Sequence, residues 1–173
     1  MPFLDYCLMQ SLLVRAAELR DAEATAAIYN YEVENTTATY DLVPRTLDAQ
    51  REWISARTGA FSVIVAEDSE LGVLGYAALS TYRDRAAYRT TVENSIYVRR
   101  DQQRRGVGKL LLNALLDVAR DSGFHTVVAR IDSQSEASRA LHASLGFVEV
   151  GIEREVGRKF GRWLDSVIMQ RML

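Results

Sequence analysis

A basic loop that contains two glycines lies near the middle of the chain and has the residue types of a phosphate-binding site. Its sequence, QRRGVG at residues 103–108, stands between a β-branched run and an amphipathic helical pattern. Glycines let the backbone approach an anion closely, and a helix that begins there adds its positive dipole end. The surrounding positive charges are Arg99, Arg100, Arg104, Arg105 and Lys109.

Two common phosphate motifs do not match this loop. A P-loop requires a glycine at Gln103 and a serine or threonine at Leu110. A dinucleotide-binding fingerprint requires a third glycine at Leu111 and belongs to the first strand–turn–helix unit of a domain. What is left is a strand, a basic loop and a helix start, which could meet a diphosphate and a further phosphate. The alternative is a solvated arginine-rich loop whose glycines serve turn geometry.

Length and composition indicate one globular domain. The chain has 173 residues, 48% of them hydrophobic and 25% charged, with a formal net charge of −2. A protein that coats nucleic acid is usually basic, so we expect no nucleic-acid partner. No spacing of histidine, cysteine and carboxylate residues indicates a metal site.

The chain contains a single cysteine, Cys7, so an intramolecular disulfide is excluded and a cytoplasmic location is expected. We treat residues 1–13 as an N-terminal leader of uncertain role. The leader has no basic region at its start, and Asp5 interrupts its apolar run. We therefore expect no targeting segment, no membrane span and no membrane partner.

Hydrophobic periodicity alternates between strand and helix character along the rest of the chain, 14–173. Strands are predicted at 12–17, 61–67, 73–80, 90–98, 125–131, 147–155 and 165–173, with a short β-prone segment at 36–42. Helices are predicted at 21–34, at 46–57, after Gly108 as far as Ser122, and at 135–145. This order predicts an α/β or α+β domain with a mixed, mostly antiparallel sheet and helices on both faces.

The first two helices have recognisable caps and apolar faces. Asp21 is the expected N-cap of the first, with Ala24, Ala27, Ile28 and Tyr31 facing inward. Thr46 is the expected N-cap of the second, with Leu47, Trp53 and Ile54 facing inward.

The loop and a later helix together resemble the GNAT family of acetyl-CoA-dependent N-acetyltransferases. The pattern Gln103-x-x-Gly106-x-Gly108 resembles the family's pyrophosphate loop, and SEASRALHASLGF at 135–147 resembles its later helix. The resemblance implies that Ser138 lies near the pantetheine arm; the family usually has asparagine where Ser135 stands. The implied acetyl-CoA-binding residues are Ile96, Tyr97, Val98, Gln103, Arg104, Arg105, Gly106, Val107, Gly108, Lys109 and Ser138.

Three further blocks resemble the phosphinothricin and methionine sulfone or sulfoximine N-acetyltransferases within this family. They are IYNYEVENTTATY, YRTTVENSIYV and GRKFGRWLDSVIMQ, and the resemblance runs from about Val14 to the C-terminus. It implies a small-molecule amine as acceptor and a homodimer. The segment KFGRWLD could reach a neighbouring subunit's site; from the residues alone it is a hairpin turn with aromatic packing.

Acetyl transfer to an amine requires the neutral amine, because an ammonium has no lone pair. Even a peptide's α-amino group has a pKa of about 8, so a base must lie within reach. Glu93, just before the loop, is the leading candidate, and burial would raise its pKa toward a useful value. The alternative is a carboxylate at the surface or on an edge strand.

His142 is the second catalytic candidate. It lies one helical turn from Ser138 on the same face, and the resemblance implies a general acid there for the departing thiolate. A structural histidine that fills a packing gap is the alternative. For His125, a packing or surface role is expected.

The oxyanion and the acceptor need further groups. The resemblance implies that backbone N–H groups around Ile96 to Val98 serve the oxyanion. Arg83 and Arg89 are candidates for the acceptor carboxylate, because a guanidinium can bind it bidentately; solvated-loop arginines are the alternative. Tyr40 and Tyr82 are aromatic walls by resemblance, or core residues.

Three functions stay open at this point. The first is acetylation of the α-amine of a small amino acid or analogue. The second is acetylation of another amine, such as a polyamine, a drug or a peptide N-terminus. The third is a non-catalytic acyl-CoA-binding module, which ranks last because Glu93 and His142 are both present.

Overall fold

A single mixed sheet of seven strands organises the chain, and the computed structural model describes residues 12–173 of it. The strand order is β1-β2-β3-β4-β5-β7-β6. The strands are β1 Leu12–Ala16, β2 Ile64–Asp68, β3 Gly72–Thr81, β4 Thr91–Val98, β5 Thr126–Asp132, β6 Val148–Lys159 and β7 Arg162–Met172. The helices are α2 Ala22–Asn35, α3 Leu47–Ser55, α4 Val107–Asp121 and α5 Glu136–Ser144, with short 3-10 turns at Leu19–Asp21, Gly59–Phe61, Ala86–Tyr88 and Arg100–Gln102.

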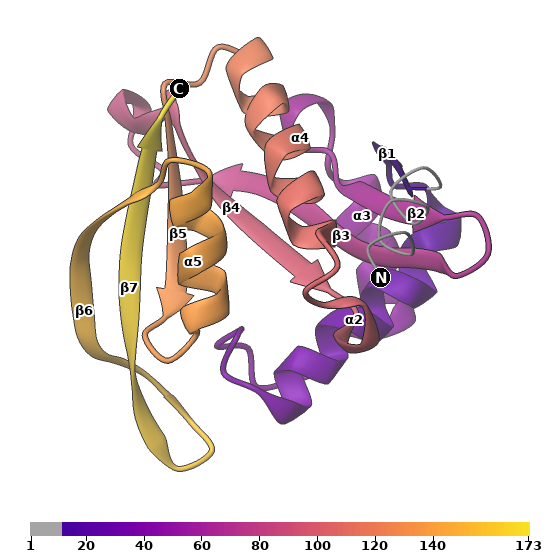
Figure 1. The fold of residues 1–173 in the computed structure, drawn as a ribbon, viewed down its shortest axis with the longest axis horizontal. Coiled ribbons are helices and arrows are strands. Elements are labelled where there is room, and N and C mark those ends of the chain that lie inside the picture. The colour runs from indigo at the N-terminus through magenta and orange to yellow at the C-terminus, as the bar shows by residue number, and fades with distance from the viewer. Residues whose placement is uncertain (1–11) are drawn as a thin grey trace, which may run out of the picture.

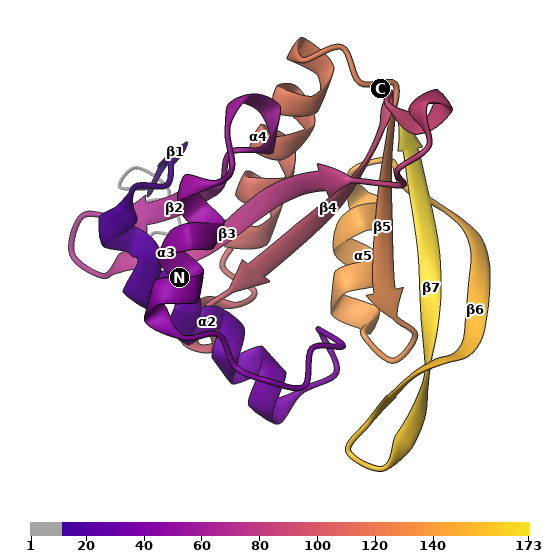
Figure 2. The ribbon, with the colours of Figure 1, turned by 180° about the vertical axis from the view of Figure 1, so that it is seen from behind.

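Helices cover both faces of the sheet, as the sequence pattern predicts. The helices α4 and α5 lie on one face and α2 and α3 on the other, which Figures 1 and 2 show from opposite sides. The first face buries Leu111 and Leu115 of α4 against the sheet, and the second buries Ile28 and Tyr29 of α2. The sheet therefore separates two apolar clusters that stabilise it from both sides.

The two central strands β4 and β5 are the only parallel pair among the described strands, and they separate soon after they begin. Their pairing covers only Thr91–Glu93 against Thr126–Val128. Beyond that point β4 stays bonded to β3, while β5 stays bonded to β7 along its whole length. Each strand follows its antiparallel neighbour, so the pair opens like a wedge toward the end of β4 (Figure 1).

The prediction for the inward face of the first helix was right for Ala24 and Ile28, which pack in the second apolar cluster, and wrong for Ala27 and Tyr31. Ile28 is buried, whereas Tyr31 is 47% exposed and Ala27 is exposed. The buried face includes two polar residues, Thr25 and Glu32, whose hydrogen bonds satisfy them inside the fold. A hydrophobic pattern alone does not count such residues as inward-facing.

Local capping was predicted with mixed success. Thr46 caps α3 as expected, since its side chain accepts a hydrogen bond from the Ala49 N–H. Asp21 occupies the N-cap position of α2 as expected, but its carboxylate makes no capping hydrogen bond and pairs with Arg15 (2.7 Å) instead. The segment 36–42 is a loop and not a strand, and Leu47 is exposed instead of facing inward. Of the 1–13 leader, residues 1–11 lie outside the described part, whereas Leu12 and Leu13 already belong to β1.

We expect Gly75→Ala to destabilise the fold. A Cβ at this position would lie 2.8 Å from the Tyr97 carbonyl oxygen and 3.1 Å from Leu111 Cδ1, where β3, β4 and α4 meet. Such overpacking costs about 1–3 kcal/mol in free energy of unfolding. Gly151→Ala is the matched control, because nothing lies within 4 Å of its added Cβ. Urea unfolding measures both variants; equal stability of the two would contradict the close packing at Gly75.

Candidate active site

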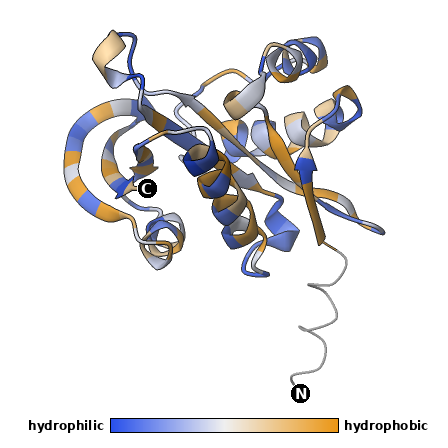
Figure 3. Cartoon of the chain, turned by 90° about the horizontal axis from the view of Figure 1, so that it is seen from above, coloured by the Kyte–Doolittle hydropathy of each residue, from blue (hydrophilic) through white to orange (hydrophobic). Residues whose placement is uncertain are grey.

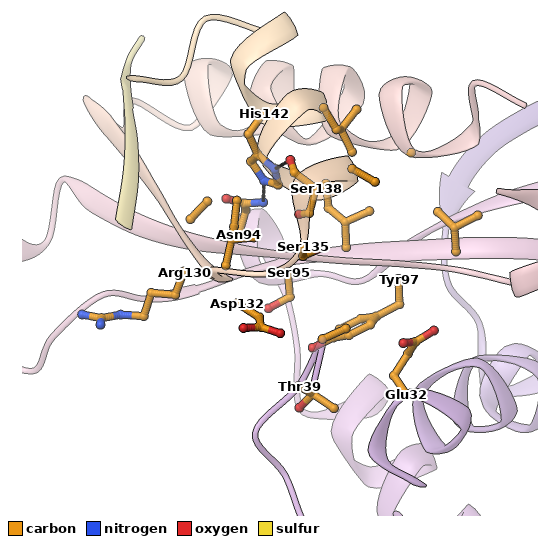
Figure 4. A pocket seen from close by; sticks show the side chains of 18 of the residues that line it. Glu32, Thr39, Asn94, Ser95, Tyr97, Arg130, Asp132, Ser135, Ser138 and His142 are labelled. Atoms are coloured by element: carbon orange, nitrogen blue, oxygen red, sulfur yellow. Dashed lines mark hydrogen bonds between the residues drawn. The ribbon is translucent and has the colours of Figure 1, made fainter. Parts of the chain in front are cut away.

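A cavity of about 730 Å³ occupies the opening between β4 and β5. Residues of both strands, of the loop before α4, of α5 and of the segment 38–40 line it. Figure 4 shows Asn94 and His142 on one side of the strands and Tyr97, Asp132 and Glu32 on the other, while the Arg130 side chain extends away from them. The divergence of the two strands thus creates a passage through the sheet.

The side chains of β4 alternate between the two faces of the sheet and give the cavity two sides. Ile96 and Val98 pack with the apolar cluster under α4, and Asn94 bonds to His142 of α5. Tyr97 packs edge-on against Tyr29 of α2, with ring centroids 5.1 Å apart. Because alternate residues share a face, Glu93 lies on the α2 side with Tyr97.

Backbone N–H groups of β4 point into the opening. The Arg99 N–H donates to the Leu74 carbonyl at 2.8 Å, which fixes the phase of the antiparallel β3–β4 ladder. By the alternation of such a ladder, Ile96 and Val98 direct their N–H groups away from β3. No β5 residue pairs with them there. Ile96, Tyr97 and Val98 were predicted to supply backbone donors, but the Tyr97 N–H points toward β3. Tyr97 therefore contributes its side chain to the cavity and not its N–H.

The glycine loop begins α4 at one end of the cavity. Gly106 is the N-cap with a φ of 84°, and Arg104 before it also has a positive φ, 61°. The first helical hydrogen bond is donated by the Leu110 N–H to the Gly106 carbonyl, so the preceding N–H groups have no partner within the helix. Gln103, Arg104, Gly106, Gly108 and Lys109 line the cavity.

Two residues predicted to bind the cofactor do not line the cavity. The Val107 side chain is 1% exposed and packs in the core under α4. The Arg105 guanidinium donates to the Gln102 side-chain oxygen. The helix periodicity that buries Leu111 also buries Val107 one turn earlier, which explains why Val107 does not line the cavity.

Glu93 is partly buried at the point where the two strands separate. Burial raises the pKa of its carboxyl, and the nearby Glu153 carboxylate raises it further, while the Arg130 guanidinium lowers it. Arg130 Nε lies 3.3 Å from Glu93 Oε2 and contacts Glu153 through Nη1. Glu93 is therefore a carboxylate with a raised pKa that is held in an ion pair.

His142 is buried, and both of its ring nitrogens are engaged. Nδ1 lies 2.8 Å from the Ser138 carbonyl, which can only accept, so this nitrogen carries the proton. Nε2 then accepts from Asn94 Nδ2 at 2.9 Å (Figure 4). Burial lowers the pKa of His142, so the ring is neutral at pH 7. Asn94 Oδ1 is buried without a hydrogen-bond partner in the described chain.

The predicted acceptor-binding residues divide into two groups. Tyr40 lines the cavity, and its hydroxyl donates to the Asp165 carbonyl at 3.1 Å; burial raises its pKa to about 12. Tyr82, Arg83 and Arg89 lie in the β3–β4 connection and do not line the cavity. Arg83 instead stacks over Tyr82, with its Cζ 4.9 Å from the ring centroid.

Sequence reasoning missed several charged residues that line the cavity. They are Glu32, Arg130, Asp132 and Glu153, whereas Arg100, predicted among the positive charges around the loop, does line the cavity. Arg130 and Asp132 alternate with the apolar Ala129 and Ile131 in β5, a pattern that could have placed both on one face. Glu32 pairs with Arg100 at 2.7 Å across two distant segments, which no local pattern indicates.

Neither a metal cluster nor a membrane-spanning helix is found in residues 12–173. No group of three or more histidine, cysteine, aspartate or glutamate side chains there could hold a metal ion. None of the helices in this part of the chain is both long and apolar enough to cross a membrane.

The site thus consists of an opening in the sheet, a helix N-terminus beside it and a carboxylate across from it, and the chain can be compared with known proteins on this basis. The model for the acetyltransferase (GNAT) domain matches residues 14–168, so the chain belongs to this family. The resemblance and the single-domain fold inferred from the sequence are thereby confirmed.

Individual relatives agree with the family assignment. An L-methionine sulfoximine/L-methionine sulfone acetyltransferase of Pseudomonas paraeruginosa is 44% identical over 92% of this chain and 94% of its own. An L-amino acid N-acyltransferase of Escherichia coli is 45% identical over 92% and 93%. The structure of a phosphinothricin acetyltransferase from Sinorhizobium meliloti in complex with acetyl-CoA is 37% identical, with a TM-score of 0.89 over 94% and 89%.

We expect His142 to make folding stability depend on pH. Burial lowers the pKa of His142 in the folded state, whereas an unfolded histidine has a pKa of about 6.5. Below that value the unfolded chain takes up a proton that the folded chain does not, so stability is lost as pH falls. Melting temperatures should therefore fall more steeply in the wild type than in His142→Gln between about pH 7.5 and about pH 5.5.

The exposed His125 offers a matched control for this experiment. His125→Gln should melt with the pH dependence of the wild type. A wild-type curve parallel to that of His142→Gln would show that the buried neutral ring is wrongly assigned.

Proposed function

We propose that the protein is an acetyl-CoA-dependent N-acetyltransferase that acetylates the α-amino group of a small amino acid or amino-acid analogue. One observation carries the proposal: a single cavity joins the N-terminus of α4, the unpaired edge of β4 and the carboxylate of Glu93. The names of the relatives, which include acetyltransferases of methionine sulfone and phosphinothricin, support the acceptor class.

The α4 side of the cavity suits coenzyme A. Free N–H groups at the start of α4, together with Arg104 and Lys109, would hold its diphosphate. The pantetheine arm would run along β4, where the N–H groups of Ile96 and Val98 and the Ser138 segment can bond its amides. Bound there, acetyl-CoA supplies an activated thioester to the narrow end of the opening.

The reaction we propose is a direct transfer. Glu93 accepts a proton from the acceptor's ammonium, directly or through water, and the freed amine attacks the thioester carbonyl carbon. A C–N bond forms and the C–S bond breaks, so the sulfur leaves with the electron pair and takes up the proton that the attacking nitrogen loses. The N–H groups of β4 stabilise negative charge on the carbonyl oxygen.

His142 fits a positioning role better than that of the proton donor to sulfur. Its only proton is engaged with the Ser138 carbonyl, and Nε2 is occupied by the Asn94 amide. The general-acid role implied by resemblance stays a prediction. We propose that the ring fixes Asn94, whose unpartnered Oδ1 can then accept a hydrogen bond from an amide in the cavity.

A second acceptor class is supported by the charge of the α2 side. Three carboxylates line this side, those of Glu93, Asp132 and Glu153, whereas the nearest guanidinium is that of Arg130. This excess of carboxylates favours a cationic acceptor such as a polyamine. The roles predicted for Arg83 and Arg89 would require the β3–β4 connection to approach the cavity, and they stay predictions.

We also propose a cytoplasmic homodimer. The edge strand β6 exposes Val148, Val150, Ile152 and Val156, and Figure 3 shows it at the left with apolar and polar residues mixed along its length. Trp163, near the start of β7, is also 60% exposed. Lys159–Arg162 forms the predicted hairpin turn. Sedimentation velocity tests the proposal; a monomer at micromolar concentration would contradict it.

The proposed function is tested by thiol release from acetyl-CoA with a panel of acceptors. The panel contains methionine sulfone, phosphinothricin, the common amino acids, polyamines and peptides. Preferred turnover of one amino acid or analogue supports the first acceptor class, and preferred turnover of polyamines supports the second. Binding of acetyl-CoA without turnover of any amine would contradict the proposal and favour a non-catalytic module.

We expect Glu93→Gln to lower kcat by about 10²–10⁴-fold, because the amide cannot accept the proton. The affinity for coenzyme A, measured by titration calorimetry, should stay unchanged, because Glu93 lies on the α2 side of β4 and the proposed coenzyme A site lies on the α4 side. The acid limb of the wild-type rate profile should lie above the usual pKa of glutamate, in the direction set by burial. Full turnover by the variant would refute the base assignment.

A further inference from the structure

We propose that Arg130 is the group that binds the acceptor's α-carboxylate, so that it sets acceptor specificity. The inference rests on the proposed function and adds a residue to it. Arg130 lies on β5 two residues beyond Val128, the last residue that pairs with β4, and it lines the cavity. Its neighbours Ala129 and Ile131 pack in the cluster under α4, so Arg130 faces the α2 side together with Glu93.

The guanidinium of Arg130 is accessible and already binds carboxylates. It is 29% exposed, lies 3.3 Å from Glu93 and also pairs with Glu153 of β6. The planar guanidinium fork matches a carboxylate better than any other side chain does. Glu153, itself 34% exposed on an edge strand, occupies the position that an acceptor's carboxylate would take.

Covalent geometry links this contact to the chemistry. In an α-amino acid a single carbon separates the amine from the carboxylate carbon. A carboxylate bound to Arg130 would therefore bring the amine next to Glu93, the proposed base. The acceptor arrives as a zwitterion: its ammonium meets Glu93, and its carboxylate replaces Glu153 on the guanidinium. The replacement keeps the charge on Arg130 paired throughout.

The other arginines near the cavity are less suited to this role. Arg83 and Arg89, predicted from the sequence, do not line it. Arg100 is held by the buried carboxylate of Glu32 at 2.7 Å. Arg104 lies in the loop before α4, on the side proposed for the diphosphate. Arg130 is thus the arginine that lies beside the base.

The test compares two acceptors that differ only in the carboxylate: methionine sulfone and its decarboxylated amine, 3-(methylsulfonyl)propan-1-amine. Arg130→Gln should raise the KM for methionine sulfone about 30-fold, through the lost charged hydrogen bonds. The KM values for the decarboxylated amine and for acetyl-CoA should change little. Arg120→Gln, which removes an exposed arginine paired with Asp117 on α4, is the matched control.

Glu153→Gln supplies a second test in the opposite direction. If Glu153 competes with the acceptor for Arg130, this isosteric change should lower the KM for methionine sulfone several-fold relative to the KM for the decarboxylated amine, because any effect of Glu153 on the pKa of Glu93 is common to both acceptors. Because the variant is expected to gain affinity, a folding defect cannot mimic the result.

Each outcome separates this inference from the proposed function. An equal loss with both acceptors in Arg130→Gln would mean that Arg130 only positions Glu93, which would overturn the inference and leave the acetyltransferase intact. Unchanged kinetics in both variants would also overturn it. A wild-type protein that acetylates no amine would overturn the proposed function itself, and the inference with it.

Discussion

The separation of β4 from β5 is the constraint on which the rest of the structure depends. Two parallel strands in the middle of a sheet normally stay paired, because their backbone groups are costly to leave unbonded. Here β4 stays paired with β3 and β5 with β7, but β4 and β5 pair with each other over only three residue pairs. The opening supplies both a passage through the sheet and a row of free N–H groups along it.

The polar residues at this opening are arranged in pairs that cross from one element to another. On the α4 and α5 side, the His142 ring fixes the amide of Asn94. On the α2 side, Arg130 holds Glu93 and Glu153. Removing one member would leave a buried or half-buried partner unsatisfied, which costs more than the pair itself contributes. The same pairs therefore fix the positions of the polar groups that line the opening.

The sequence predicted what local chemistry determines and missed what tertiary contact determines. The loop at residues 103–108 could be recognised because glycines, positive charge and a helix start are adjacent in the chain. The family and the fold followed and are confirmed. The inward face of α2 was predicted only in part, because Thr25 and Glu32 are buried with partners that periodicity does not reveal. Likewise, the pairing of Arg130 with Glu93 and Glu153 joins three strands, and no local pattern contains it.

A crystal structure of the protein with acetyl-CoA tests the central claim most directly. We expect the diphosphate to bind the N–H groups at the start of α4 and the pantetheine arm to lie between β4 and β5. The thioester carbonyl should face the N–H groups of β4, opposite Glu93. A thioester that lay outside this opening, or strands that closed on each other in the complex, would contradict this claim.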